Sequence, residues 1–312
     1  MTQQRIVFFG TPDFAVPSLM ALGGTHHEIS LVVTQPDRPR GRGRKMMAPP
    51  VKETARKLGL PVAQPDSIQE HEFTDEMKRI SPDFFVVVAF GALLKADLLA
   101  IPKIGTVNVH ASLLPLYRGP APIHWAIIKG ESKTGVTTML LDTGVDTGEM
   151  LLSRETEIQP DDTTATLHDR LADLGAAVLT DTMDAYASAT IEPIPQNHAL
   201  ATYAPMLQKK DGRIDWQWSA DRIEALIRGT NPWPGAFTYH GNKRLKIWSA
   251  DVTSADTTEH PGTVLRGFDD ELRVATGDGI LAIRVIQSES GKRMPVKDFL
   301  RGYPLEPGAV LT

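Results

Sequence analysis

Two polar side chains near the end of a short apolar segment are the first candidates for chemistry in this sequence. Asn108 and His110 lie two residues apart in residues 105–112 (GTVNVHAS), which predict a β-strand, so both side chains project from one face. An amide N–H and an imidazolium N–H can both stabilise an oxygen that becomes negative during a reaction. The same two residues could instead only satisfy the polar end of a strand, because buried polar groups usually find partners.

A glycine-rich turn offers a carboxylate to the same place. Residues 142–148 (DTGVDTG) contain two aspartates, and Gly144 and Gly148 permit tight backbone geometry. We expect the turn to bring Asp146 towards His110, where a carboxylate favours the charged imidazole and can accept a proton. Paired aspartates are also common in glycine-rich turns, so this turn alone indicates no activity.

The residue types argue against a metal site or a covalent nucleophile of the cysteine type. The chain has no cysteine, which excludes thiolate zinc sites, iron–sulfur clusters and cysteine nucleophiles. His110 and His124 lack the spacing of metal ligands, and no acidic cluster accompanies them, so no metal is expected. The lack of a serine–histidine pair excludes only reactions that require a covalent serine intermediate.

The segment after the predicted strand is an apolar loop. Residues 112–122 (SLLPLYRGPAP) contain leucines and prolines but have neither a helical nor a strand period. Apolar residues in a loop usually cover a core or line a pocket, and ligand pockets are mostly apolar.

The elements that must position these residues follow an alternating pattern. Short apolar segments rich in valine and phenylalanine are separated by segments with helical spacing, which indicates a buried, mostly parallel sheet between two helix layers. The sequence therefore predicts a doubly wound α/β fold, Rossmann-like, whose ligands bind at the carboxyl ends of its strands. The predicted strands are residues 5–10, 28–34, 61–64, 83–90, 105–112, 134–141 and 149–158, and the predicted helices are residues 14–22, 51–58, 67–80 and 167–183.

The pattern changes after the last of these helices. Residues 191–205 contain Pro193, Pro195 and Pro205 and predict an extended linker. Beyond the linker, short strands and frequent glycine turns predict a small β-barrel of the OB-like kind. We expect a catalytic domain in residues 1–190, a linker in 191–205 and an OB-like domain in 206–312. The predicted barrel strands are residues 236–239, 245–248, 262–265, 272–275 and 279–286.

Composition sets the broad class of protein. The 312 residues include 33 Lys plus Arg and 38 Asp plus Glu, a net charge of −5, and 41% are hydrophobic, as in an ordinary globular enzyme. No apolar run approaches the roughly 18 residues that a membrane span needs, so no membrane partner is expected. The absence of cysteine fits a reducing compartment, and we expect a cytoplasmic protein, with a monomer as the default.

One local basic segment stands out against the negative net charge. Residues 35–50 (QPDRPRGRGRKMMAPP) follow the second predicted strand and should overhang the same edge of the sheet as His110. Such a loop could bind phosphates, while the alternative is an ordinary solvated charged loop. A second basic region with interleaved tryptophans lies in residues 209–248, where the tryptophans are expected in the core. The candidate phosphate-binding residues are Arg38, Arg40, Arg42, Arg44 and Lys45.

Three motifs together resemble the folate-dependent formyltransferase family. They are FFGTPDFAVPSL at residues 8–19, the Asn108-Val-His110 strand with its SLLPLYRGPAP loop, and DTGVDTG at the turn. The resemblance spans both predicted domains. It implies 10-formyltetrahydrofolate as the formyl donor and catalytic roles for Asn108, His110 and Asp146. It also implies that Ser112, Leu113, Leu114 and Pro115 help to hold the folate.

The catalytic residues do not identify the acceptor, since family members formylate glycinamide ribonucleotide, amino sugars or methionyl-tRNA. The acceptor must be inferred from other parts of the sequence. The basic segment favours RNA, and Arg42 resembles the tRNA-contacting arginine of the family. The resemblance thus implies transfer to the α-amino group of methionine on initiator methionyl-tRNA.

Other functions remain open at this point. The nearest is formylation of a nucleotide-linked amino sugar, and a more distant one is an RNA-binding module whose catalytic domain has decayed. A dehydrogenase is disfavoured because the turn at Gly10-Thr11-Pro12 lacks the Gly-x-Gly-x-x-Gly fingerprint.

Overall fold

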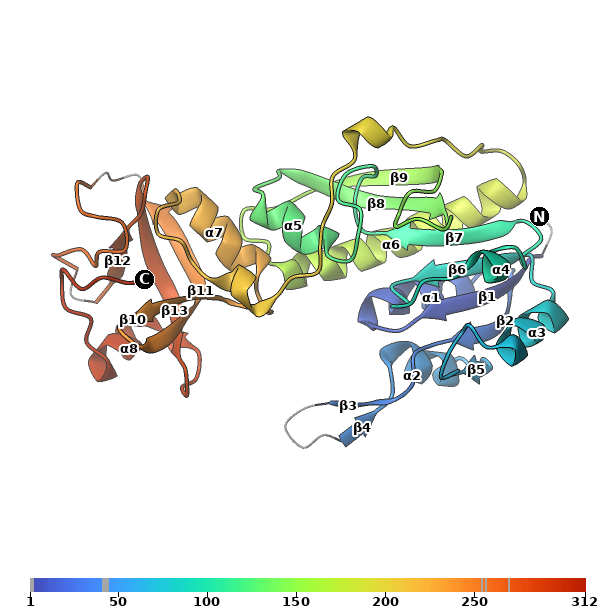
Figure 1. Cartoon of the computed structure of the whole chain (residues 1–312), viewed down its shortest axis with the longest axis horizontal. Helices are drawn as coiled ribbons and strands as arrows, with labels where there is room; N and C mark the ends of the chain where they lie inside the picture. The colour runs from blue at the N-terminus through green and yellow to red at the C-terminus, as the bar shows by residue number, and fades with distance from the viewer. Residues whose placement is uncertain (1–2, 41–44, 254, 256, 269) are drawn as a thin grey trace. The chain divides into compact units, whose positions relative to one another are not determined.

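A seven-stranded sheet forms the centre of the first part of the chain. The computed structural model describes residues 3–40, 45–253, 255, 257–268 and 270–312. In the strand order β5-β2-β1-β6-β7-β8-β9, the first five strands pair in parallel and β7 pairs with β8 in antiparallel fashion. This confirms the predicted α/β class with a mostly parallel sheet (Figure 1). The strands are β1 (Arg5–Gly10), β2 (Glu28–Val33), β5 (Val62–Ala63), β6 (Phe84–Val88), β7 (Gly105–His110), β8 (Lys133–Leu140) and β9 (Met150–Glu157).

The central strands are apolar on both faces because helices cover both. Val7 and Phe9 of β1 share one core cluster with Phe73 and Met77 of α3. On β7, Val109 lies close to Gly175 of α6, where an added Cβ would come within 3.0 Å of the valine. Burial on two sides explains the continuous valine and phenylalanine runs of the sequence. The helices of this part are α1 (Val16–Gly23), α2 (Pro50–Lys57), α3 (His71–Ile80), α4 (Ala96–Leu99) and α6 (Thr164–Ala187).

The parallel strands end together at one edge of the sheet. The carboxyl ends of β2, β1, β6 and β7 are neighbours in the strand order, and they lead into the segments after Val33, Gly10, Val88 and His110. Open α/β sheets bind their ligands at such an edge. The residues that follow these strands are therefore the ones to examine for a site.

The chain divides into two compact units. Unit 1 comprises Met1–Gly119, Thr134–Glu157 and His168–Ala204, and unit 2 comprises Pro120–Lys133, Ile158–Leu167 and Pro205–Thr312. Two segments that precede residue 205 thus belong with the C-terminal part. Among the described residues, no helix combines the length and apolarity that crossing a membrane requires.

Unit 2 is built on a curled antiparallel sheet, as expected for an OB-like domain. Its strand order is β10-β11-β13-β12, and β14 pairs with β13. The predicted strand at residues 262–265 is wrong as a strand, since Thr263 and Val264 make only isolated bridges. The elements are α5 (Pro122–Ile128), α7 (Ala220–Gly229), β10 (Ala236–His240), β11 (Lys243–Thr253), β12 (Leu272–Ala275), β13 (Ile280–Ser288), β14 (Met294–Pro295) and α8 (Val296–Gly302).

Helix α7 supplies much of the apolar contact to this sheet. Ser219 accepts a hydrogen bond from the Arg222 N–H at the start of the helix, as an N-cap should. Ile223 and Leu226 face the core of unit 2 together with Leu245 and Ile247 of β11. The alternation along β11 buries these two residues and leaves the neighbouring Arg244 and Lys246 half-buried on the other face.

Candidate active site

His110 ends β7 with both ring nitrogens directed at acceptors. Its Nε2 lies 2.9 Å from the carbonyl oxygen of Tyr117, and its Nδ1 lies 3.6 Å from Oδ2 of Asp146. The side chain of His110 is 7% exposed and that of Asp146 is 16% exposed. A proton on Nε2 can donate to the Tyr117 carbonyl, and the Asp146 carboxylate faces the other ring nitrogen.

Asp146 is held in place at its backbone and at its carboxylate. Its φ of +51° is in the left-handed region, which an aspartate adopts only at some cost. The N–H of Gly119 donates to Oδ2 over 2.8 Å, so the loop after β7 and the glycine-rich turn meet at this oxygen. Asp142 braces the turn itself by accepting from the Gly144 N–H and the Thr147 hydroxyl.

Asn108 lies on the same strand face as His110, two residues before the carboxyl end of β7. It is buried, and its backbone is in register with Val87 of β6 and Met139 of β8. The alternation of side chains along β7 directs it to the side of His110. The structure therefore brings His110 and Asp146 together and places Asn108 on the same face of β7 as His110.

The arrangement can stabilise negative charge and move a proton. The amide of Asn108 can donate to a developing oxyanion, and a charged imidazole adds favourable electrostatics even while its N–H groups contact Tyr117 and Asp146. The Asp146 carboxylate, which keeps some exposure, can accept a proton from an amine or from a bridging water. The contact with Tyr117 is a constraint on His110 that the sequence did not predict.

The loop after β7 is fixed by hydrogen bonds to β8. The Ser112 hydroxyl donates to the Leu116 carbonyl, and the Thr137 hydroxyl donates to the carbonyl of Ser112. The N–H of Leu114 donates in turn to Oγ1 of Thr137, while Pro115 follows through a cis peptide bond. Ser112 and Leu114 are buried, and Leu113 and Pro115 are half-buried. The hydroxyl of Ser112 is thus engaged with the loop, and the half-buried apolar side chains are the ones that remain accessible.

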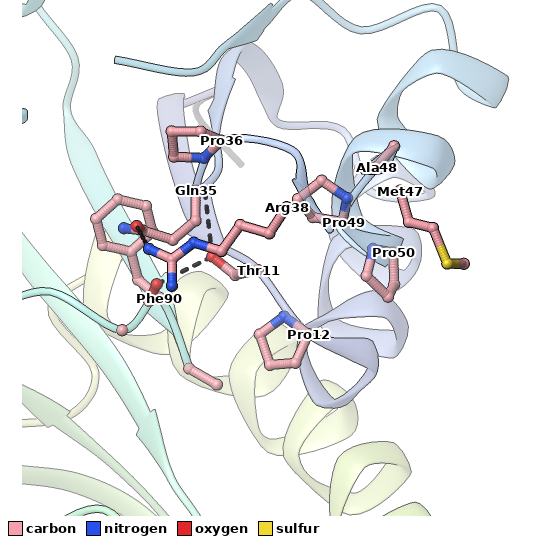
Figure 2. Close-up of a pocket in the computed structure, with 12 residues that line it drawn as sticks. Thr11, Pro12, Gln35, Pro36, Arg38, Met47, Ala48, Pro49, Pro50 and Phe90 are labelled. Carbon is pink, nitrogen blue, oxygen red and sulfur yellow. Dashed lines mark hydrogen bonds between the residues drawn. The ribbon is translucent and has the colours of Figure 1, made fainter. Parts of the chain in front are cut away.

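A pocket of about 320 Å³ opens at the ends of β1, β2 and β6, next to the strand that ends in His110. Figure 2 shows the Thr11 hydroxyl donating to the Phe90 carbonyl and accepting from the Gln35 N–H at its floor. The guanidinium of Arg38 reaches over this region and contacts Oε1 of Gln35. The remaining walls are apolar and rich in proline: Pro12, Pro36, Met47, Ala48, Pro49, Pro50, Ala89 and Gly91.

The described parts of the basic segment form two paired strands, a hairpin, whereas the sequence predicted a loop. The strands β3 (Arg38–Arg40) and β4 (Lys45–Met47) pair in antiparallel register, with Arg40 opposite Lys45. The period of two was masked by the alternating arginines and glycines, which have little intrinsic strand preference. Of the predicted phosphate-binding residues, Arg38 lines the pocket, whereas Arg42 and Arg44 lie outside the described residues.

The root of the hairpin is anchored by an ion pair. Lys52 of α2 contacts Oδ1 of Asp37 over 2.7 Å, and the amide of Gln64 donates to Asp37 and to the Gln35 carbonyl. The hydrogen bonds from Lys52 and Gln64 hold the pKa of Asp37 below its ordinary value. A charged Asp37 therefore ties the start of the hairpin to the sheet edge.

The sequence did not predict that two residues, Gly119 and Gln196, contact Asp146. Gly119 was part of the quoted loop but offered no sign that its N–H would bind Asp146. Gln196 lies in the predicted linker, yet its amide donates to the carbonyls of Asp146 and Gly148. No local pattern could have found this contact, because the partners are 50 residues apart.

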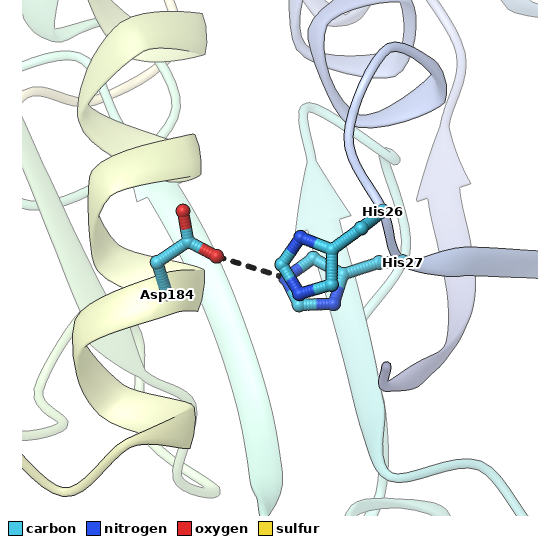
Figure 3. A group of neighbouring side chains, drawn as sticks. All are labelled: His26, His27 and Asp184. Carbon is cyan, nitrogen blue, oxygen red and sulfur yellow. Dashed lines mark ion pairs between the residues drawn. The ribbon is translucent and has the colours of Figure 1, made fainter. Parts of the chain in front are cut away.

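A second polar cluster lies at the opposite, amino-terminal side of the sheet. His26, His27 and Asp184 place their ligand atoms within 4.8 Å of one another (Figure 3). The Gln4 N–H donates to Nδ1 of His27, which leaves the ring proton on Nε2, 3.4 Å from Oδ1 of Asp184. A metal ligand needs a free lone pair at Nε2 and usually donates from Nδ1. The geometry thus favours a histidine–aspartate pair over a metal site.

In unit 2, the tryptophans divide between the core and the basic face. Trp216 is buried and donates to the Thr238 hydroxyl. Trp248 is 8% exposed, with Lys246 and Arg293 stacked on its ring. Burial and the nearby positive charges lower the pKa of Lys246. The half-buried cations of β11 thus gather on one face of this sheet.

The fold and this site define a formyl transferase. Residues 4–183 match the Formyl transferase family, residues 206–304 match the Formyl transferase C-terminal domain, and the chain belongs to this family. A relative from Citrifermentans bemidjiense is named methionyl-tRNA formyltransferase and is 49% identical over 311 residues, covering 100% of this chain and 97% of the relative. The family predicted from the three motifs is thereby confirmed.

Solved structures with lower identity share the fold. An N-formyltransferase from Helicobacter canadensis, in complex with folinic acid and dTDP-3-aminofucose, is 19% identical with a TM-score of 0.68, over 94% of this chain and 100% of that one. HypX from Aquifex aeolicus, in complex with tetrahydrofolic acid, is 17% identical with a TM-score of 0.63 over 100% of this chain. This chain spans only 51% of HypX.

Proposed function

We propose that this protein transfers the formyl group of 10-formyltetrahydrofolate to the α-amino group of methionine on initiator methionyl-tRNA. The observation that carries the chemistry is the contact of His110 with Asp146 at 3.6 Å, beside Asn108 on the same strand face. The amine nitrogen attacks the formyl carbon, and the carbonyl oxygen becomes negative in the tetrahedral intermediate. Cleavage of the bond to N10 then leaves tetrahydrofolate, which takes up one proton, and the formylated amine, which has lost one.

Each of the three side chains has a separate task in this reaction. Asn108 donates to the oxyanion, and His110 in its charged form stabilises it electrostatically. Asp146 keeps the imidazole oriented and accepts the proton that leaves the attacking amine, directly or through one water. The folate is held by the loop of Ser112, Leu113, Leu114 and Pro115. Hydrogen bonds fix the backbone of this loop, and its half-buried apolar side chains remain accessible to the folate.

The acceptor is supported by identity and by charge. Relatives at 48% and 49% identity over almost the whole chain carry the name methionyl-tRNA formyltransferase. The basic segment of the sequence supplies Arg38, Arg40, Arg42, Arg44 and Lys45 to bind the phosphates of the acceptor end. The adjacent apolar pocket, with Arg38 at its rim, suits a terminal nucleotide or its methionyl group.

The domain roles follow from this assignment. Residues 1–190 carry out catalysis, residues 191–205 connect the domains and residues 206–312 hold the tRNA backbone. The protein acts as a monomer in the cytoplasm, where its acceptor takes part in translation. Size-exclusion chromatography with light scattering tests the oligomeric state, and a mass of twice 34.1 kDa would contradict it.

A comparison of acceptors tests the proposed function. Initiator methionyl-tRNA, glycinamide ribonucleotide and a nucleotide-linked amino sugar are each incubated with 10-formyltetrahydrofolate, and formylated product is measured by mass spectrometry. We expect formylated product only in the incubation that contains methionyl-tRNA. Product with the amino sugar would favour the alternative acceptor, and no product with any acceptor would contradict the formyl transfer itself.

A further inference from the structure

The segment that follows α6 is fastened along the active-site loops of unit 1. Ile194 exchanges two backbone hydrogen bonds with Met150, at 2.8 and 2.9 Å. Ten residues on, the Arg118 N–H donates to the Thr202 carbonyl and the Ala204 N–H donates to the Arg118 carbonyl. We call residues 194–204 the strap. The strap was predicted as an extended linker, but its backbone is tied to unit 1 at both ends.

Gln196 is a buried polar residue of the strap, and its side-chain amide has four contacts. Its Nε2 donates to the carbonyls of Asp146, at 3.0 Å, and Gly148, at 2.7 Å. Its Oε1 accepts from Nε and Nη2 of Arg118, at 3.1 and 2.7 Å. A primary amide has two N–H groups and one carbonyl oxygen with two lone pairs, so its capacity is used completely.

Arg118 determines which way the amide points. A guanidinium only donates hydrogen bonds, and the two nitrogens of Arg118 that approach Gln196 must therefore face its oxygen. Nη2 of Arg118 also lies 3.1 Å from Nδ1 of His198. Arg118 is only 2% exposed, so water cannot substitute for these partners easily. The NH₂ group of Gln196 is consequently committed to the turn that carries Asp146.

We propose that Gln196 is a positioning residue for Asp146, and that Arg118 orients Gln196 for this task. Asp146 has a left-handed backbone, with its carbonyl held by Gln196 and its carboxylate held by the Gly119 N–H. If the amide donor is lost, the carbonyls of Asp146 and Gly148 are no longer bridged by the Gln196 NH₂ group. The turn then relaxes, and the carboxylate of Asp146 shifts relative to His110. The inference rests on the proposed function, in which this carboxylate orients the imidazole and accepts a proton.

The substitution Gln196→Glu separates positioning from folding. Glutamate keeps an acceptor for Arg118 and can form an ion pair with it, but it cannot donate to the carbonyls of Asp146 and Gly148. We expect kcat to fall by about 10- to 100-fold, as for a small displacement of a catalytic group, while KM for both substrates stays within about threefold. The alkaline limb of the pH profile of kcat should also move to lower pH, because a displaced carboxylate favours the charged imidazole less.

A matched control is available in unit 2. Gln287 has the same pattern as Gln196, since its Oε1 accepts from the indole N–H of Trp248 and its Nε2 donates to the Gly291 carbonyl. Gln287→Glu is therefore the same chemical change in a similarly bonded amide with no contact to Asp146. Gln287 pairs with Lys246 on the basic face of unit 2, so the comparison is made at saturating methionyl-tRNA, where we expect kcat and its pH profile to be unchanged even if KM for tRNA rises.

A double variant tests whether Gln196 acts through Asp146. Residues that act as a unit show non-additive losses, so Gln196→Glu combined with Asp146→Asn should be no slower than Asp146→Asn alone. The imidazole resonances of His110 give a readout without activity, assigned with a His110→Gln variant. They should move in Gln196→Glu and not in Gln287→Glu.

Each outcome decides the inference. A Gln196→Glu enzyme with unchanged kcat, unchanged pH profile and unchanged His110 resonances would overturn it, and so would additive losses in the double variant. A Gln196→Glu chain that does not fold would overturn it as well, because Gln196 would then serve the fold. If the unsubstituted protein formylates no acceptor, the proposed function fails, while the His110 resonances still report on positioning.

Discussion

The replacement of Asp146 by asparagine is the most direct test of the active site. Asparagine keeps the shape of the side chain and an oxygen for the Gly119 N–H, but it removes the charge that faces His110. At the observed separation of 3.6 Å, Coulomb's law gives about 1 kcal/mol in a water-like medium and about 5 kcal/mol at an effective dielectric constant of 20. Both side chains are largely covered, so we take about 3 to 4 kcal/mol, which corresponds to about 100- to 1000-fold in rate.

The assay measures single-turnover formylation of methionyl-tRNA with saturating 10-formyltetrahydrofolate. We expect kcat of Asp146→Asn to fall by about 100- to 1000-fold, while the affinity for folate, measured by fluorescence titration, changes little. Asp142→Asn is the matched control in the same turn, because the Asp142 carboxylate accepts from the Gly144 N–H and the Thr147 hydroxyl and braces the turn itself. An Asp146→Asn enzyme within fivefold of the unsubstituted rate, or equal losses in both variants, would refute the electrostatic reasoning.

Three further predictions concern the hairpin, the loop after β7 and the histidine pair. Arg38→Ala should raise KM for tRNA and reduce the slope of log Kd against log salt by about 0.7 to 0.9, and an unchanged slope would mean that Arg38 contacts no phosphate. Gly119→Ala should lower the free energy of unfolding in urea by about 1 to 3 kcal/mol, since φ is +109° and the new Cβ would lie 3.0 Å from the Ala204 carbonyl oxygen. Gly59→Ala is the control, because φ is +70° there and the space is open, so its loss of stability measures the backbone strain without the steric contact. Burial lowers the pKa of His27 from its ordinary 6.5, with His26 acting in the same direction, so the folded state binds fewer protons than the unfolded state. This contribution to the free energy of unfolding is complete above pH 6.5 and is lost as the pH falls through the folded-state pKa. Urea denaturation at several pH values should therefore show a free energy of unfolding that depends less on pH in His27→Gln than in the unsubstituted protein.

Much of the fold could be predicted because its signals are local. The strands β1, β2, β6 and β7 lie within a residue or two of the predicted apolar segments, since each is buried on both faces and must be apolar along its length. The hairpin β3–β4 was missed because its strands are short and basic. Helices α4, α5 and α8 were missed as well, being only four to seven residues long, too short to show a full helical period.

The candidate site was predictable to the extent that its residues share an element or a motif. Asn108 and His110 could be paired from their spacing alone, because a strand has a side-chain period of two. Asp146 was joined to them through the expectation that the glycine-rich turn faces the same crevice. Gly119 and Gln196 could not be assigned, since their bonds to Asp146 are made by a backbone N–H and by a side chain from a distant segment.

The sequence by itself determined the alternation of strands and helices, the polar pair on β7 and the basic character of the hairpin, because these depend on neighbours along the chain. Only the tertiary structure decided that Asp146 lies 3.6 Å from His110, that Tyr117 occupies the other ring nitrogen, and that Gln196 holds the turn. Such contacts join segments that are far apart in the chain, and their lengths are set by how the sheet, the loops and the strap pack. A residue's type states which hydrogen bonds it can make, and the packing selects the partner.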